Sequence, residues 1–150
     1  MTSNSGRLLA LDVGTLRIGV AVCDALRMVA SPLLTVQRQS VKKDSAQIVE
    51  VAQAEGVCGV VVGLPLGLDG GETRSTRLAR QIGDAVAEGS DLPVTYHDER
   101  FSSVEAERRL IERDVSRKAR KKRIDQSAAA VILQDFLESV GSAGFPPATD

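Results

Sequence analysis

The segment 57–62 constrains the fold more than any other part of the sequence, because it is apolar almost throughout and is bounded by Gly56 and Gly63. A run of this length and composition is typical of a β-strand that is covered on both faces, as in the centre of a parallel α/β sheet. Apolar residues recur at helical spacing on either side of it, over residues 44–55 and 72–87, with Gly89 closing the second helix. The sequence therefore predicts an α/β fold.

Three strands are expected before the first helix. Residues 8–13 and 18–23 have strand composition and are joined by the turn-like Gly14-Thr15, and residues 33–36 form a third short apolar run. Strands that follow one another so closely predict an antiparallel meander. A further strand is expected at residues 93–96, so that the complete pattern indicates a mixed sheet with helices on its faces.

In the C-terminal third, two helices are expected, one before and one after a basic segment. Ser102 or Ser103 can cap one helix, and residues 124–140 carry a strong apolar stripe that predicts a deeply packed one. Residues 117–123, between the two, are expected to form a flexible linker. We expect a single domain over residues 1–150, with a polar tail at 1–6 and a disordered tail at 141–150.

Composition excludes several classes of function. No apolar run reaches the roughly 20 residues that cross a bilayer, and residues 1–6 do not resemble a signal sequence, so we expect no membrane span and a cytoplasmic protein. Two cysteines and one histidine are too few for structural zinc. Because only 3% of the residues are aromatic, stacking of bases on aromatic side chains cannot be the main binding device.

Charge is distributed unevenly along the chain. The formal net charge is -1, but residues 100–123 carry ten basic and four acidic side chains, so this window is at +6 and the remainder at -7. Six of the cations fall within residues 117–123, which contain no acid. A solvated surface is the ordinary explanation of such a run. The alternative is a phosphate-binding surface in which Lys118, Lys121 and Lys122 bind a nucleic acid substrate.

Common nucleotide and hydrolase motifs are missing from the sequence. The glycine-rich loop at 63–71 contains no Gly-Lys-Ser/Thr, and no Gly-x-Gly-x-x-Gly follows an expected strand. The only histidine, His97, ends a strand and has no nucleophile elbow beside it. Phosphate-loop, dinucleotide and acyl-transfer sites are therefore not expected.

Carboxylates remain as the candidates for chemistry. Asp12 stands near the end of the first strand among apolar neighbours. A metal ion there would compensate the cost of burying its charge. The alternative is that the Asp12 side chain forms a turn with Gly14. Asp98 and Glu99 end the last strand, at the edge where α/β sheets place ligands. Asp125 begins the final helix, where it can equally serve as an N-terminal charge. Together these acids suit a hard divalent cation.

Four blocks of the sequence form a recognisable set. They are LALDVGTLRIGVA from residue 9, VGLPLxxDG from residue 62, HDERFSSVEA from residue 97, and IDxxAA from residue 124 followed by VILQ from residue 131. In this order they span nearly the whole chain and resemble the YqgF/RuvX family. That family is described as ribonuclease H-like, as Holliday junction resolvases, and as acting on the precursor of small-subunit ribosomal RNA.

The resemblance implies a ribonuclease H-like fold, a five-stranded mixed sheet with helices on both faces and the first strand lying centrally beside the second and fourth. It also implies that Asp12, Glu99 and Asp125 are the catalytic carboxylates and bind Mg²⁺ or Mn²⁺, with two ions expected. Arg17 and Arg100 flank two of these acids, so they are candidates for holding substrate phosphate or are ordinary surface arginines.

The expected activity is divalent-metal-dependent cleavage of phosphodiester bonds in structured nucleic acid. A precursor of 16S ribosomal RNA and a Holliday junction both remain open as substrates, and the protein is expected to act as a monomer or a homodimer. One competing hypothesis is an actin-like sugar kinase, whose first phosphate loop resembles Asp12-Val13-Gly14-Thr15 but which needs two such domains. The other is a non-catalytic nucleic-acid-binding or ribosome-assembly module of the same fold.

The two cysteines are expected to be inert. With the implied strand order, Cys23 and Cys58 lie on strands either side of the first, about 9 to 10 Å apart. Since this separation exceeds the reach of a disulfide, both are expected to be core thiols. An intermolecular bridge would require one of them to be exposed.

Overall fold

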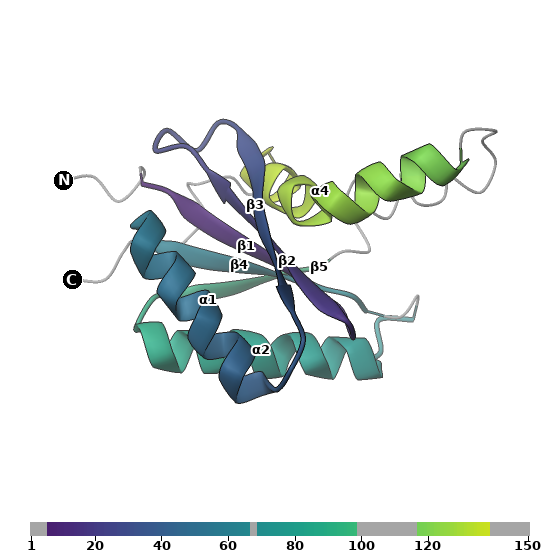
Figure 1. The fold of residues 1–150 in the computed structure, drawn as a ribbon, viewed down its shortest axis with the longest axis horizontal. Helices are drawn as coiled ribbons and strands as arrows, with labels where there is room; N and C mark the ends of the chain where they lie inside the picture. The colour runs from purple at the N-terminus through teal and green to yellow at the C-terminus, as the bar shows by residue number, and fades with distance from the viewer. Residues whose placement is uncertain (1–5, 67–68, 99–116, 139–150) are drawn as a thin grey trace.

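A five-stranded sheet covered by helices on both faces forms the part of the chain that the computed structural model describes, namely residues 6–66, 69–98 and 117–138, with side chains in the last range from residue 128 (Figure 1). The strands are β1 (Leu8–Val13), β2 (Arg17–Cys23), β3 (Ala30–Gln37), β4 (Gly59–Leu64) and β5 (Val94–Asp98). The helices are α1 (Val41–Glu55), α2 (Arg74–Ser90) and α4 (Arg117–Glu138). None of these helices is both long and apolar enough to cross a membrane.

The sheet is mixed and β1 lies at its centre, in the order β3-β2-β1-β4-β5. β1, β2 and β3 pair antiparallel, so the predicted meander is confirmed. β4 pairs parallel to both β1 and β5, and every one of its residues is buried, as the apolar run predicted. The strand order implied by the resemblance, with the first strand beside the second and fourth, is also confirmed.

The two faces of the sheet pack against different helices. Because successive side chains of a strand point to opposite faces, Leu9, Leu11 and Val13 of β1 join the core beneath α1 and α2. Leu8 and Ala10 join a separate core with α4. Figure 1 shows α1 and α2 below the sheet and α4, in yellow-green, above it. The residues of β1 therefore alternate between these two faces.

Capping side chains shift the helix boundaries by a few residues from those expected. α1 begins at Val41 because Ser40 accepts a hydrogen bond from the Lys43 amide, and it ends at Gly56, whose φ of 66° is left-handed. α2 continues past Gly89, which was expected to end it. Asp91 provides the C-cap, with φ of 60° and its N–H donated to the Ala87 carbonyl.

The expectation for the basic segment is wrong. Residues 117–123 are not a linker, because α4 begins at Arg117 and runs without a break to Glu138. Lysine, arginine and alanine are good helix formers, and this segment contains no glycine or proline to interrupt the helix that follows it. The helix expected from Ser102 or Ser103 and the tail at 141–150 lie outside the described residues.

The thiols of the two cysteines are not joined to each other. Cys23 is buried, and burial raises the pKa of its thiol, which therefore remains protonated and accepts a hydrogen bond from the Leu8 amide at 3.2 Å. Cys58 is half-buried, and the guanidinium of Arg27 lies 3.2 Å from its sulfur. Both belong to the packing at the start of β1, at the far end of that strand from Asp12.

Candidate active site

Asp12 lies near the carboxyl end of the central strand β1 and is the one half-buried residue in an otherwise buried strand. It has the same parity as Leu8 and Ala10, meaning that it lies an even number of positions from each of them along the strand. Its side chain therefore belongs to the face that α4 covers. On β2 its partner is Gly19, which has no side chain to cover it. The sequence thus places a carboxylate at the accessible end of the most central strand.

The hairpin loop after β1 is held in a fixed conformation. The Gly14 amide donates to the Arg17 carbonyl at 2.9 Å, and a Cβ at Gly14 would come within 2.9 Å of that same oxygen. Only glycine allows the two backbones to approach so closely. The loop that follows Asp12 therefore depends on Gly14.

Arg38 ties this loop to the body of the protein. Its amide donates to the Leu16 carbonyl at 3.0 Å and its Nη1 donates to the Gly14 carbonyl at 3.3 Å. Its Nε lies 2.6 Å from Oδ2 of Asp44, a carboxylate that is only 1% exposed. No motif in the sequence predicts this role, because Arg38 and Gly14 are 24 residues apart and the spacing of Arg38 and Asp44 gives no sign of the contact.

Asp12 lines a hollow of about 210 Å³ that opens beside this loop. The side chain of Arg17 is exposed at its rim, and Thr15 and Thr35 add hydroxyl groups to the wall. The full lining comprises Asp12, Gly14, Thr15, Leu16, Arg17, Gly19 and Thr35. The structure thus brings together two of the predicted site residues, Asp12 and Arg17.

Helix α4 crosses the sheet close to Asp12. A Cβ built on Gly19 would lie 3.7 Å from the Cβ of Ala129 and 3.8 Å from that of Asp12, so helix and strand meet at this point. Further along the helix, Gln134 bonds the Ala30 amide at 2.9 Å, at the opposite end of the sheet. α4 therefore runs antiparallel to β1. Asp125 is one helical turn before Ala129, about 6 Å along the axis towards the end of β1 that carries Asp12.

The side chains of β5 alternate between the two faces of the sheet. His97 faces α4, with its Nε2 3.2 Å from Oδ2 of Asp135 and its ring edge-on to Phe136. Tyr96 faces α2, and its hydroxyl donates to Asp84 at 2.6 Å. Asp98, two residues on, has the parity of Tyr96 and so belongs to the face opposite Asp12.

The side chain of Tyr96 packs closely against α2. A Cβ at Gly83 of α2 would come within 2.5 Å of the tyrosine oxygen, so a larger residue there would displace the tyrosine ring. Burial, together with the adjacent Asp84 carboxylate, raises the pKa of Tyr96 far above its ordinary value. The phenol consequently keeps its hydrogen, with the Asp84 carboxylate at 2.6 Å and the Arg80 carbonyl at 3.1 Å as acceptors, and these contacts hold β5 against α2.

The other predicted site residues are placed only in part. Glu99 and Arg100 lie outside the described residues. Lys118, Lys121 and Asp125 lie on α4, together with Lys122, but in the stretch whose side chains are not described. Among the side chains that are described, no three of His, Cys, Asp and Glu are grouped as a metal site.

The arrangement of strands and helices matches that of a known nuclease. A structure of Thermus thermophilus RuvC in complex with Holliday junction substrate superimposes with a TM-score of 0.57 at 16% identity, covering 95% of this chain and 99% of that one. A second structure of Thermus thermophilus RuvC gives a TM-score of 0.51, also at 16% identity, over 90% and 97% of the two chains. This likeness defines the class by fold, as ribonuclease H-like.

Sequence comparison identifies the family. Residues 6–139 match the RuvX family, described as Holliday junction resolvase, and the chain belongs to this family. A protein of Cereibacter sphaeroides (strain ATCC 17025 / ATH 2.4.3) is 44% identical over 140 residues, which cover 93% of this chain and 88% of that one. A protein of Myxococcus xanthus (strain DK1622) is 44% identical over 144 residues, covering 96% and 93%. Both bear the name "Putative pre-16S rRNA nuclease".

The predicted family and fold class are confirmed by these matches. They also support the predicted class of enzyme, a nuclease that hydrolyses ester bonds of nucleic acid. The roles of the individual site residues stay predictions, because the comparisons describe whole chains and not side chains.

Proposed function

We propose that the protein cleaves phosphodiester bonds of the precursor of 16S ribosomal RNA, at a divalent-metal site formed by Asp12, Glu99 and Asp125. The observation that carries this proposal is the crossing of α4 over Gly19, beside Asp12. Because α4 crosses there, its helical turn with Asp125 lies towards the same end of β1 as Asp12, which lines a hollow. If the extended conformation of β5 continues by one residue, Glu99 has the parity of His97 and belongs to the same face.

Asp12 fits a hard cation by its chemistry and its surroundings. Its carboxylate is half-buried, stands at the rim of the sheet, and opens onto space of about 210 Å³ with hydroxyl groups of Thr15 and Thr35 in the wall. Carboxylate and hydroxyl oxygens are the donors that Mg²⁺ and Mn²⁺ prefer. Asp12, Glu99 and Asp125 would hold the metal, with two ions expected.

When bound, the metal supplies a Lewis acid that lowers the pKa of an attacking water and stabilises the leaving oxygen. The chain's own residues would position the reacting groups. Arg38, fixed by Asp44, holds the loop after Asp12 rigid, so the carboxylate keeps its place when substrate binds. Arg17 at the rim can bind a non-bridging phosphate oxygen and orient the phosphodiester.

Further residues are proposed to bind the substrate strand away from the reacting bond. Arg100 follows Glu99 directly, and Lys118, Lys121 and Lys122 lie on the helical segment that precedes Asp125. Their charges attract the phosphate backbone without reading its sequence. We further propose that the chain acts in the cytoplasm as one nuclease domain, either as a monomer or as a homodimer.

The test is a cleavage assay on four substrates, with Mg²⁺ and with Mn²⁺: a precursor 16S rRNA fragment, single-stranded RNA, a linear duplex and a four-way DNA junction. We expect metal-dependent cleavage of the rRNA precursor, which the Asp12→Asn variant does not perform. Preferential cleavage of the junction would assign the substrate to branched DNA instead. Binding without cleavage by wild type under every condition would identify a non-catalytic assembly module and overturn the proposal.

A further inference from the structure

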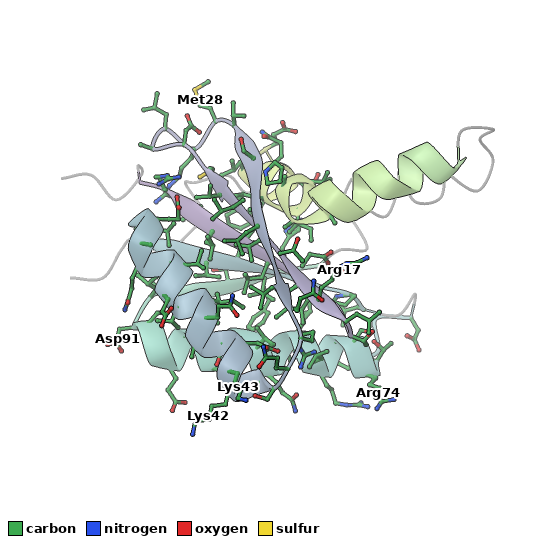
Figure 2. All side chains as sticks on the ribbon, in the orientation of Figure 1. Arg17, Met28, Lys42, Lys43, Arg74 and Asp91 are labelled. Atoms are coloured by element: carbon green, nitrogen blue, oxygen red, sulfur yellow. The ribbon has the colours of Figure 1, made fainter. Side chains whose placement is uncertain are left out.

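A second hollow lies on the other side of the hairpin loop from Asp12. It measures about 610 Å³ and lies between the loop, Arg38 and the start of α2. Its lining comprises Thr15, Arg38, Arg74, Arg77, Leu78 and Gln81. Thr15 lines both this hollow and the one with Asp12, so a single loop separates them. Figure 2 shows Arg17 and Arg74 at the same end of the molecule, on the right.

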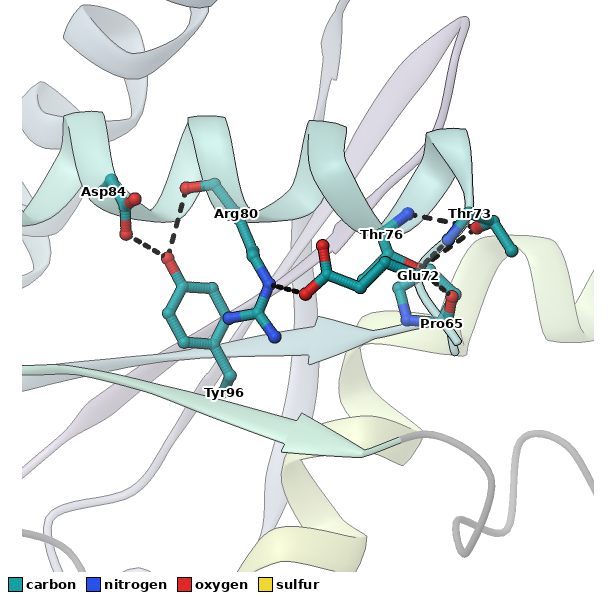
Figure 3. Close-up of polar contacts among 7 residues, drawn as sticks. All are labelled: Pro65, Glu72, Thr73, Thr76, Arg80, Asp84 and Tyr96. Carbon is teal, nitrogen blue, oxygen red and sulfur yellow. Dashed lines mark hydrogen bonds and ion pairs between the residues drawn. The ribbon is translucent and has the colours of Figure 1, made fainter. Parts of the chain in front are cut away.

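The charge of this hollow, which we call the arginine pocket, is not balanced within the described part of the chain. Arg38 is neutralised by Asp44, but Arg74 and Arg77 are exposed and have no acidic partner among the described residues. No acid occurs in the first turn of α2. The nearest one in sequence, Glu72, is directed instead to Arg80, at 2.7 Å (Figure 3).

The turn that carries both arginines is anchored at its base. Thr73 and Thr76 form a capping box, in which the Thr73 hydroxyl accepts from the Thr76 amide and the Thr76 hydroxyl accepts from the Thr73 amide (Figure 3). Thr76 is fully buried, and its hydroxyl oxygen lies 2.6 Å from the Pro65 carbonyl, just beyond the end of β4. This contact fixes the first turn of α2 relative to the sheet.

Arg74 and Arg77 are three residues apart, so they lie on the same side of the helix. A guanidinium binds phosphate oxygens in a bidentate manner, and the positive end of the α2 dipole adds to their attraction for anions. The arginines lie in a pocket that is open to solvent and shares a wall with the candidate active site. The arginines and Asp12 are therefore on neighbouring hollows that share Thr15 of the hairpin loop.

We propose that the arginine pocket binds backbone phosphates of the same nucleic acid strand whose scissile bond lies at Asp12, and thereby sets the path of the strand across the hairpin loop. This inference rests on the proposed function, since it takes the substrate to be a polynucleotide. The shared Thr15 wall supports a strand as the ligand, because it makes the two hollows neighbours along one path.

The experiment measures binding of a fluorescein-labelled RNA hairpin with a single-stranded tail, in EDTA, at several salt concentrations. The Arg74→Gln/Arg77→Gln double variant should bind more weakly, and its salt slope should fall by about 1.4 if the two arginines bind single-stranded phosphates or about 1.8 if they bind duplex phosphates. The control variant Lys42→Gln/Lys43→Gln, on α1, also removes two positive charges, from exposed positions outside the pocket. Its affinity and salt slope should match those of wild type. Circular dichroism melts verify that both variants are folded.

Substrate length supplies a second readout. With tails too short to reach the pocket, the arginine variant should bind like wild type, and the difference should emerge only above a threshold length. An unchanged slope, or an equal loss of affinity in the lysine control, overturns the inference while leaving the nuclease proposal standing. If inorganic phosphate at constant ionic strength binds wild type but not the arginine variant, and displaces RNA from neither, the pocket is a free-phosphate site and the inference is wrong. Failure of wild type to bind any RNA refutes both proposals.

Discussion

The two faces of the sheet are built from different residues. The face beneath α1 and α2 is filled by branched side chains such as Leu11, Val62 and Ile82, all fully buried. Among the described residues, the face beneath α4 has the large side chains of β1 at the start of that strand, whereas Gly19 and Ala129 meet beside Asp12. Large side chains stabilise the first face, while small ones let a helix approach the strand that carries the acid.

Residues that stabilise the fold and residues proposed to take part in the chemistry therefore lie on opposite faces of one sheet. Adjacent residues of β1 belong to opposite faces, so Leu11 is a core residue and Asp12 is a candidate ligand although they are neighbours in sequence. The polar pair His97 and Asp135 also lies on the α4 face. Substitutions on the two faces should therefore have opposite signatures, one in the free energy of unfolding and the other in turnover.

The largest effect is expected from the adjacent pair Asp12 and Leu11. Asp12→Asn removes one negative charge at nearly constant volume, so metal-dependent cleavage should fall by orders of magnitude while the melting temperature changes little. Leu11→Ala should lose about 2–5 kcal/mol of unfolding free energy and retain its turnover per folded molecule. Turnover close to wild type in Asp12→Asn, with an unchanged melting temperature, would remove the basis for the three-acid site.

The second prediction compares Asp98 with Glu99. Asp98 has the parity of Tyr96, on the α2 face, so Asp98→Ala should have the smaller kinetic effect. Glu99→Gln should reduce cleavage nearly as much as Asp12→Asn, because it removes a metal ligand. Single-turnover rates at saturating Mg²⁺ provide the measurement. A greater loss of activity in Asp98→Ala would show that the alternation of β5 does not determine which acid binds the metal.

The third prediction uses two buried alanines, one on each side of the sheet. Ala129→Leu and Ala79→Leu both overpack a core and should each cost about 1–3 kcal/mol of unfolding free energy. Only Ala129→Leu should also reduce turnover per folded molecule, because it moves α4 away from Gly19 and with it the turn that carries Asp125. Equal activity of the two folded variants would contradict the assignment of Asp125 to the site.

Local sequence patterns predicted most of this fold because each element of it follows a local rule. The apolar run at 57–62 predicted the fully buried strand β4, and the succession of three short strands predicted the meander. Asp12 was likewise recognisable, since a carboxylate is out of character in an apolar strand. These features depend only on residues close together in the chain.

Features that depend on distant residues could not be predicted in this way. The Arg38–Asp44 pair matters because it holds the loop at 14–16, and the arginine pocket requires the start of α2 to lie beside that loop. The expectation of a linker before Asp125 is wrong for another reason. A dense run of charge indicates exposure to solvent, and an exposed segment of lysines and arginines can equally be helical because both residues have high helix propensity.

The smallest effect is expected from that basic segment, and its helical structure sharpens the prediction. Lys118, Lys121 and Lys122 follow the spacing i, i+3, i+4, so in α4 their positions lie on one side of the helix rather than along a flexible chain. Replacing all three by glutamine should weaken RNA binding broadly across sequences and lower the salt slope by about 0.7 to 0.9 for each phosphate that the segment no longer neutralises. Turnover at saturating substrate should change little, because these residues are proposed to position the strand and not to react with it. Titrations at several salt concentrations, compared with the Lys42→Gln/Lys43→Gln control, test this directly. If slope and affinity are both unchanged, the segment is a solvated surface of α4 and its charge has no part in binding substrate.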